Sequence, residues 1–576
     1  MALNTQLSCA SIAFTFAGYC PALAQAPLVD VFGQNASEAL GSSVVGLGDV
    51  DGDGIGDVAV GAKKADGLQL GAGVVRIFSG FDGHLIRQIK GEHSGDDFGH
   101  ALDAVGDQNF DGVTDLIVGA PYYEPAGGSD RGAVYVYSGA TGALLKKVEG
   151  QADGDQLGFA VSGVPDATGD GVTDYLFSAP WADSGGKTDN GSVWLYYGWW
   201  HTQAPFGFSS GGASGDALGY SLDGLEDFTG DGFGDLLLGA PFKDIGALVD
   251  AGQVSRKSGA TGAGYATFNG DAAFGWLGKS VVGLPDVNGD GEPEFAVGQP
   301  FVSIGGIVGS GSIRVYSSIN GAVMYSITGG LQENYGWVLG ALEDFDGDGK
   351  GDLLVGVPFA DFGGFSDVGA LRIYSGVNGA LLHESRGLHG GESCGASVGS
   401  AGDVNGDGVS DALLGATKNS NVVALGGRAR VLLGDAPLPS SYCTAKTNSA
   451  GCLPRVSVNG CASTTVGQLT IRATEVLPNI SGLLFWSRSP TAVPFHGGTL
   501  CVGAPQRRTP VQQSVVNGAG WPCTGLFSYS FSHAQMQIEG LVAGNQIYAQ
   551  FWMRDPGFAP PNNTGLTDGM SITILP

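Results

Sequence analysis

Seven acidic loops of one design recur along this chain of 576 residues, and successive loops begin 58 to 61 residues apart. The first loop reads Asp49-Val-Asp51-Gly-Asp53-Gly-Ile-Gly-Asp57, and the others begin at Asp107, Asp166, Asp227, Asp286, Asp344 and Asp403. A long fixed period is typical of repeat architectures, in which each repeat is one supersecondary unit packed against its neighbours. The loops therefore limit the fold to a repeat array.

The loops also predict a ligand, because oxygen-bearing side chains fall at positions 1, 3, 5 and 9 and glycine occupies position 6. A tight loop with this spacing turns several oxygens onto one point, as a hard cation such as Ca²⁺ requires. With position 7 included, the predicted metal residues are Asp49, Asp51, Asp53, Ile55, Asp57; Asp107, Asn109, Asp111, Val113, Asp115; Asp166, Thr168, Asp170, Val172, Asp174; Asp227, Thr229, Asp231, Phe233, Asp235; Asp286, Asn288, Asp290, Glu292, Glu294; Asp344, Asp346, Asp348, Lys350, Asp352; and Asp403, Asn405, Asp407, Val409, Asp411.

The alternative interpretation is that these loops are Asx-turns that cap hairpins without metal. Unneutralised carboxylates this close would repel one another and raise their own pKa values, which favours metal. Loops 1 and 6 have four acids each and are the strongest candidates, whereas Thr168 and Thr229 are weaker ligands and Glu294 is one methylene longer than aspartate. None is an EF-hand, because the bidentate glutamate at position 12 is absent.

Each loop belongs to a longer unit. An apolar residue and a glycine precede the loop, and a short apolar run ending in Gly-Ala-Pro or a variant follows it, as at Gly119-Ala120-Pro121. An alternating run such as residues 132–139 and a last strand-like run such as residues 143–149 complete the unit. Period-2 alternation between glycine- and aspartate-rich turns indicates about four antiparallel strands. Four-stranded units repeated around a ring form a β-propeller.

Together these elements resemble the FG-GAP repeat of the integrin α-subunit head, over roughly residues 27 to 437. The resemblance implies an all-β fold, a seven-bladed β-propeller, with up to seven mainly structural Ca²⁺ ions. The seventh unit has a third strand at residues 428–433 but lacks a fourth. A spare strand, Leu28-Val-Asp-Val-Phe32, precedes the first unit. We expect it to complete the last blade, because ring closure removes free sheet edges.

An aromatic residue follows the proline position in five units: Tyr122, Trp181, Phe242, Phe301 and Phe359. One interpretation is packing between blades, which regularly placed apolar residues commonly provide. The other is a ligand-binding platform. In the integrin-like arrangement these connections lie on the face opposite the calcium loops, and that face binds partners.

The ends of the chain differ from the repeats. Residues 1–24 are apolar and lack acids, and Ala22-Leu23-Ala24 fits a signal-peptide cleavage site, with an uncleaved anchor as the alternative. No other stretch is long enough to span a bilayer. We therefore expect three segments: a signal peptide at 1–24, the propeller at 25–437, and a small C-terminal β-sandwich module at 438–576.

The C-terminal segment contains alternating runs at residues 468–475 and 546–553, which favour strands. Its stretches 498–502 and 552–564 resemble a C-terminal module of exported planctomycete proteins, and surface attachment and glycan binding both stay open as its role. Export makes disulfides plausible. The preferred pairs are Cys443–Cys452 and Cys501–Cys523 with Cys461 unpaired, although sequence alone does not fix connectivity. Cys394 is expected to be a buried small hydrophobe.

A net charge of −29 argues against non-specific binding to nucleic acid or anionic lipid. The segment Gly395-Ala-Ser397-Val-Gly399 matches an esterase pattern but aligns with a repeat strand, without the strand-to-helix elbow that the motif needs. We predict no catalytic residues, and an exported, secreted or cell-surface, monomeric protein that binds an extracellular protein or glycan. The alternatives are a carbohydrate-binding lectin and a propeller-type polysaccharide-degrading enzyme, which would need a cationic or histidine cluster in the central channel.

Overall fold

The computed structural model describes residues 29–576, except 126–127, 199–205, 347, 405–408, 435–440, 444, 460–468, 517–524, 542–545, 561 and 574–576. The predicted signal peptide, residues 1–24, lies outside the described residues. Contacts divide the rest of the chain into one unit that spans Pro27–Ala436 and another that spans Pro437–Pro576.

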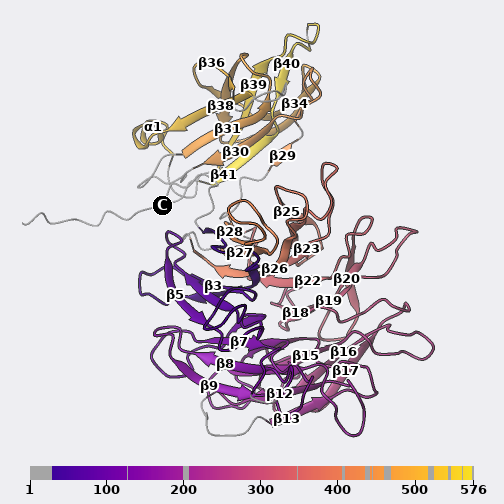
Figure 1. The fold of residues 1–576 in the computed structure, drawn as a ribbon. Coiled ribbons are helices and arrows are strands. Elements are labelled where there is room, and N and C mark those ends of the chain that lie inside the picture. Colours follow the sequence, from indigo (N-terminus) through magenta and orange to yellow (C-terminus); the bar gives the residue numbers. More distant parts are fainter. Residues whose placement is uncertain are drawn as a thin grey trace, which may run out of the picture. The chain divides into compact units, whose positions relative to one another are not determined.

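The first unit consists of seven four-stranded antiparallel sheets, which are the blades of a seven-bladed β-propeller (Figure 1). Six blades take four consecutive strands: β2 (Leu40–Gly48), β3 (Asp57–Ala62), β4 (Val74–Phe78), β5 (Leu85–Lys90); β6 (Ala101–Ala104), β7 (Leu116–Ala120), β8 (Ala133–Tyr137), β9 (Leu144–Glu149); β10 (Val161–Val164), β11 (Asp174–Ala179), β12 (Ser192–Tyr196), β13 (Phe206–Ser210); β14 (Ser221–Leu225), β15 (Asp235–Ala240), β16 (Gln253–Ser258), β17 (Gly264–Asn269); β18 (Val281–Leu284), β19 (Glu294–Gln299), β20 (Ser312–Tyr316), β21 (Val323–Thr328); and β22 (Val338–Leu342), β23 (Asp352–Val357), β24 (Ala370–Ser375), β25 (Leu381–Arg386).

The seventh blade joins the two ends of the repeat array. Its strands are β26 (Cys394–Gly402), β27 (Asp411–Ala416), β28 (Arg428–Leu432) and β1 (Asp30–Phe32), and β1 pairs antiparallel with β28. The guanidinium of Arg428 donates to both carboxylate oxygens of Asp30, at 2.6 and 2.7 Å. Val29, next to β1, is fully buried. The prediction that the N-terminal strand completes the last blade is therefore confirmed.

Burial within a blade follows the hydrophobic pattern of the sequence. The second strand is an apolar run that is buried throughout, as in β3 and β15, because neighbouring blades cover both of its faces. The outer strand is exposed or only partly buried along its length, as in β9. The main hydrophobic clusters lie between blades: Leu47 and Val75 of the first blade pack with Val118 of the second.

The first strand of each blade lies innermost. Each of these strands contacts the first strand of the next blade, and β26 contacts β2, which closes the ring. They line a central channel with a cavity of about 750 Å³. Because all seven run in the same sense, every acidic loop follows the C-terminal end of an innermost strand. The acidic loops therefore share one face of the ring, and the starts of these strands lie at the other.

The second unit is a β-sandwich, as predicted. One sheet contains β29 (Ser441–Cys443), β32 (Ser481–Ser487), β35 (Arg507–Arg508), β36 (Gln512–Gln513), β39 (Gln546–Arg554), β40 (Thr564–Leu566) and β41 (Gly569–Thr573), and the other contains β30 (Arg455–Asn459), β31 (Leu469–Val476), β37 (Val515–Val516) and β38 (Gly525–Phe531). A hairpin of β33 (Pro490–Phe495) and β34 (Gly498–Val502) accompanies them. Phe527 and Phe551, one from each sheet, stack in the shared core with ring centroids 5.8 Å apart.

The one helix in the described part of the chain is α1 (His533–Ile538), and no described helix has the length and apolar character needed to cross a membrane. Cys394 is a free, buried thiol, as expected. The side chains of Cys443, Cys461 and Cys523 lie outside the described residues, so the proposed pairing of the C-terminal cysteines stays a prediction.

Candidate metal centres and the opposite face of the ring

The first aspartate of each acidic loop organises the loop backbone. In the first loop, Oδ1 of Asp49 accepts hydrogen bonds from the amides of Gly52 at 2.6 Å and Asp53 at 3.1 Å, and Oδ2 accepts from Gly54 at 2.8 Å. Gly54, at position 6, has a φ of +88°, a left-handed conformation that glycine adopts without strain. Amides at positions 5 and 6 bond the first aspartate in the same way in the loops that begin at Asp107, Asp166, Asp227, Asp286 and Asp344.

The acid at position 9 is the first residue of the second strand, or in the second blade directly precedes it, and it is buried in every blade. Asp57 accepts from the amide of Val50 at 2.8 Å and from that of Gly80, just past the third strand, at 3.1 Å. Loops 2, 3, 4, 6 and 7 repeat both bonds at Asp115, Asp174, Asp235, Asp352 and Asp411. This acid therefore ties the loop to the third strand in addition to facing the loop interior.

Burial raises the pKa of Asp57 to about 6 and that of Asp352 to about 7; the amide donors oppose this rise and the neighbouring loop aspartates add to it. Burial likewise acts to raise the pKa of Asp166, but there the amides of Gly171 and Gly169 prevail and the pKa is lowered. The loop interiors thus carry strong negative potential, which a bound cation would relieve.

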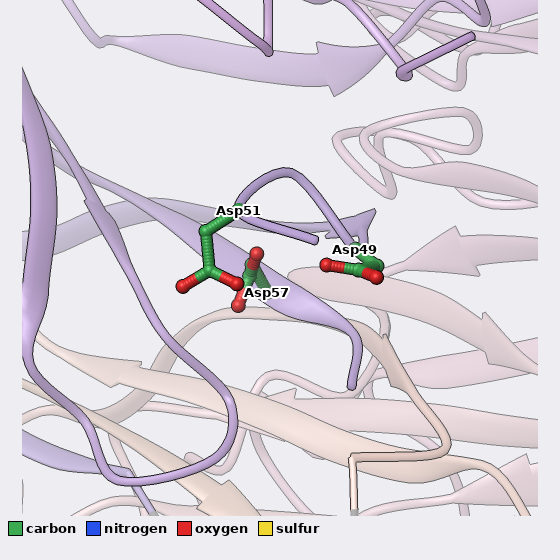
Figure 2. Close-up of side chains that lie close together, drawn as sticks. All are labelled: Asp49, Asp51 and Asp57. Carbon is green, nitrogen blue, oxygen red and sulfur yellow. The ribbon is translucent and has the colours of Figure 1, made fainter. Parts of the chain in front are cut away.

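Carboxylates converge in loops 1 and 6, the two loops with four acids. Figure 2 shows Asp49, Asp51 and Asp57, whose ligand oxygens lie within 4.8 Å of one another. Asp344, Asp346 and Asp348 form a similar group in loop 6. Among the described residues these are the acidic groups that converge so closely. Hard carboxylate oxygens at this separation fit Ca²⁺, and residues of these loops would hold it.

Loop 5 satisfies its acids differently. The side-chain amide of Asn288 donates to the carboxylate of Asp290 at 2.8 Å and to that of Glu294 at 2.6 Å. The ammonium of Lys350, at position 7 of loop 6, donates to the main-chain oxygen of Asp286 at 2.9 Å and lies 3.8 Å from its carboxylate. A lysine from the next blade thus supplies positive charge to this loop. In loop 7, Asn405 and Asp407 lie outside the described residues.

The five predicted aromatics follow the ends of second strands, at the face opposite the acidic loops. Four of them join a continuous series of ring contacts: Trp181–Phe242 at 5.8 Å, Phe242–Trp276 at 4.7 Å, Trp276–Phe301 at 4.5 Å, Phe301–Trp337 at 5.8 Å and Trp337–Phe359 at 5.0 Å. We define Trp181, Tyr220, Phe242, Trp276, Phe301, Trp337 and Phe359 as the aromatic rim. Phe301 is 37% exposed, and the other rim residues are half-buried. The rim therefore combines packing between blades with ring surface open to solvent.

Sequence reasoning missed part of this rim. Tyr220 and Trp337 directly follow the glycine that precedes each innermost strand, and Tyr220 contacts Phe242 at 5.5 Å. The corresponding residue is Phe159 in the third blade, His100 in the second and Lys279 in the fifth. The variation of this one position among aromatic and basic residues is the signal that could have found it.

The enzyme alternative would need a cationic or histidine cluster in the central channel, and the sequence alone does not indicate one. At the face opposite the acidic loops, His100 and Lys279 lie just before innermost strands, and Lys63, just past the second strand β3, contacts His100. Lys63 and His100 come from neighbouring blades, whereas Lys279 comes from the fifth blade. By contrast, Ser397 of the esterase-like segment lies within β26 and donates to the main-chain oxygen of Gly41 at 2.8 Å, as expected for a repeat strand.

Comparison with known proteins agrees with this geometry. The FG-GAP repeat model matches residues 98–137, 218–255 and 335–374. Integrin alpha-V of Gallus gallus is 29% identical over 233 residues, which cover 38% of this chain and 22% of that protein. Integrin alpha-E of Mus musculus is 34% identical over 172 residues, or 27% of this chain and 14% of that protein.

Integrin alpha pat-2 of Caenorhabditis briggsae is 37% identical over 115 residues, or 19% of this chain and 9% of that protein. The chain thus matches less than a quarter of the length of each of these curated relatives. The similarity identifies the ring as an integrin-α-like propeller of FG-GAP repeats.

Proposed function

We propose that this chain is an exported, calcium-stabilised adhesion or ligand-binding protein, which acts as a monomer outside the cell or at its surface. Ca²⁺ in the acidic loops holds each hairpin rigid, and the aromatic rim on the opposite face binds an extracellular protein or glycan. The single observation that carries this proposal is the rim itself, because partly exposed aromatic rings on a rigid scaffold are typical of binding surfaces.

A lectin is the second candidate, and the exposed ring of Phe301 favours it, since flat apolar ring faces suit the CH faces of sugars. Binding rather than catalysis fits both candidates. The C-terminal β-sandwich would attach the protein to the cell surface or add a glycan site of its own.

Two matched sets of variants test the proposal. Trp181→Ala and Phe301→Ala remove rim rings, whereas Asp51→Ala with Asp53→Ala removes acids from the first loop. The measurements are Ca²⁺ content and binding to arrays of glycans and of extracellular proteins. We expect the rim variants to lose binding with full Ca²⁺ content, and the loop variant to lose Ca²⁺ while the folded protein still binds. If the rim variants unfold instead, the rim residues serve only to pack the blades together, and the proposal is contradicted.

A further inference from the structure

Three basic residues stand at the mouth of the central channel, at the face opposite the acidic loops. His100 directly precedes β6, Lys279 lies two residues before β18, and Lys63 directly follows β3. Both β6 and β18 line the channel. The two blades that begin with β10 and β14 lie between them around the ring. In a chain with a net charge of −29, this local gathering of cations runs against the overall charge.

Lys279 has aromatic neighbours but no acidic partner. Its Nζ lies 4.4 Å from the ring centroid of Trp337 and 5.0 Å from that of Tyr220. Among the described residues, no carboxylate lies within ion-pair distance of this ammonium group. Burial lowers the pKa of Lys279 to about 8, so the group is charged at neutral pH and lacks a counter-ion.

Lys63 makes no ion pair among the described residues, although the negative charge of Asp97 acts on it and partly offsets the lowering of its pKa by burial. Its Nζ lies 3.3 Å from Nδ1 of His100, while the neighbouring Lys64 takes the nearby carboxylate of Asp97 at 2.5 Å. Burial is the main cause that lowers the pKa of His100 to about 3, and the positive charges of Lys63, Lys64 and Lys279 contribute to the same shift. His100 is therefore neutral, and the site offers two lysines to a single anion.

We propose that the channel mouth binds the carboxylate of an acidic sugar, a uronic acid, with Lys279 as the main charged partner and Lys63 as the second. This proposal rests on the binding role of the rim and names the ligand class. A uronic acid carries its carboxylate next to the flat CH face of a pyranose. The ammonium group of Lys279 would bind that carboxylate, and the neighbouring aromatic rings would contact the CH face. An acidic peptide side chain offers the carboxylate without that rigid apolar face, so it fits the site less well.

Calorimetric titration of the full chain tests this proposal at fixed Ca²⁺ concentration. The probes are trigalacturonate, its neutral methyl ester and hexaglutamate. Lys279→Met keeps the apolar stem between Tyr220 and Trp337 but removes the charge, and Lys63→Met does the same for the second lysine. Lys187→Met is the matched control: it removes the same charge from a half-buried loop lysine that donates to the main-chain oxygen of Gly212.

We expect wild-type protein and Lys187→Met to prefer trigalacturonate over the ester. Lys279→Met should lose about tenfold or more in affinity for trigalacturonate, as expected for one charge-assisted hydrogen bond, with unchanged affinity for the ester. At pH 8, binding should also take up protons, because the anion raises the pKa of Lys279. Titrations in two buffers of different ionisation enthalpy detect that uptake, and Lys279→Met should abolish it.

Each contrary outcome has a distinct meaning. No binding of trigalacturonate, or tighter binding of hexaglutamate, would overturn the assignment to an acidic sugar. Equal affinity of Lys279→Met and wild type for trigalacturonate would overturn the anion site, while the rim could still bind another ligand as proposed above. The array experiment on Trp181→Ala and Phe301→Ala tests separately whether the rim is a binding surface.

Discussion

The two faces of the propeller come from the same repeat, yet they differ in how uniform they are. On the acidic-loop face, the first aspartate bonds the same two amides in six loops, and the buried acid at position 9 bonds the loop and the third strand. On the opposite face, the residue after the repeat glycine is histidine, phenylalanine, tyrosine, lysine or tryptophan in blades 2 to 6.

Main-chain hydrogen bonds account for the difference. An acid that satisfies buried amides is required wherever the loop is built, because leaving such amides unpaired costs about 1–3 kcal/mol each. Within the described part of the chain, the rim side chains bond no main-chain groups, so their identity is free to follow a ligand. Uniformity thus marks the structural face, and variation marks the face that we propose binds.

Calcium removal should give the largest effect and tests the structural half of this comparison. At free Ca²⁺ about 100 times Kd, each occupied loop adds roughly 2.7 kcal/mol to the free energy of unfolding, and several loops contribute. We expect chelation to lower the melting temperature strongly, and Asp51→Ala with Asp53→Ala to reduce Ca²⁺ stoichiometry. Asp82→Ala, an exposed acid in the β4–β5 turn, is the control. Unchanged melting after chelation, without calorimetric Ca²⁺ uptake, would contradict the metal sites.

Removal of residues 27–34 separates features that form within one blade, such as the acidic loops, from features that need several blades, such as the rim. The truncated chain loses β1 and the buried Val29, which should lower the free energy of unfolding by about 4 kcal/mol or more. Loops 2 to 6 form within single blades and should keep their Ca²⁺, whereas the rim needs neighbouring blades and should lose its ligand. Calorimetry and the hydrodynamic radius measure both effects. An unchanged radius and melting temperature would rule out closure by β1.

The smallest effect concerns the channel between the two faces. Asp223 accepts from the amide of Gly283 at 2.7 Å and from Ser162 at 3.1 Å, and burial, with a contribution from Asp103, raises its pKa to about 7. Its folded-state pKa exceeds the unfolded value of about 4, so wild-type stability should fall as pH rises from about 4 to about 7. In Asp223→Asn, the decrease of the free energy of unfolding between pH 4 and pH 7 should be smaller by about 1–3 kcal/mol, as measured by chemical denaturation. Equal pH slopes for both proteins would contradict it.

The sequence predicts one face far better than the other. Glycines, acids and apolar runs at fixed offsets indicate the blades, the loops and even the closing strand at Leu28–Phe32, because each obeys a local hydrogen-bonding rule. Two features needed the structure. The hydrogen bond that Asp57 accepts from the amide of Gly80 depends on the third strand, and the contact of Lys63 with His100 depends on the packing of two neighbouring blades. The repeat pattern marks positions that pack between blades, as with the aromatics after the proline, but it does not say which residues meet there.

Because β1 pairs with β28, the propeller can be completed only after the chain has been synthesised through β28. Asp30 and Arg428 are 398 residues apart, so the first strand to be synthesised has no partner until the last blade exists. The six blades between them are local and can form earlier, since short-range contacts form faster than distant ones. A copy that stops before Arg428 leaves an open ring with unpaired strand edges at both ends. Incomplete copies thereby expose strand edges that can pair with other chains, whereas complete copies hide them.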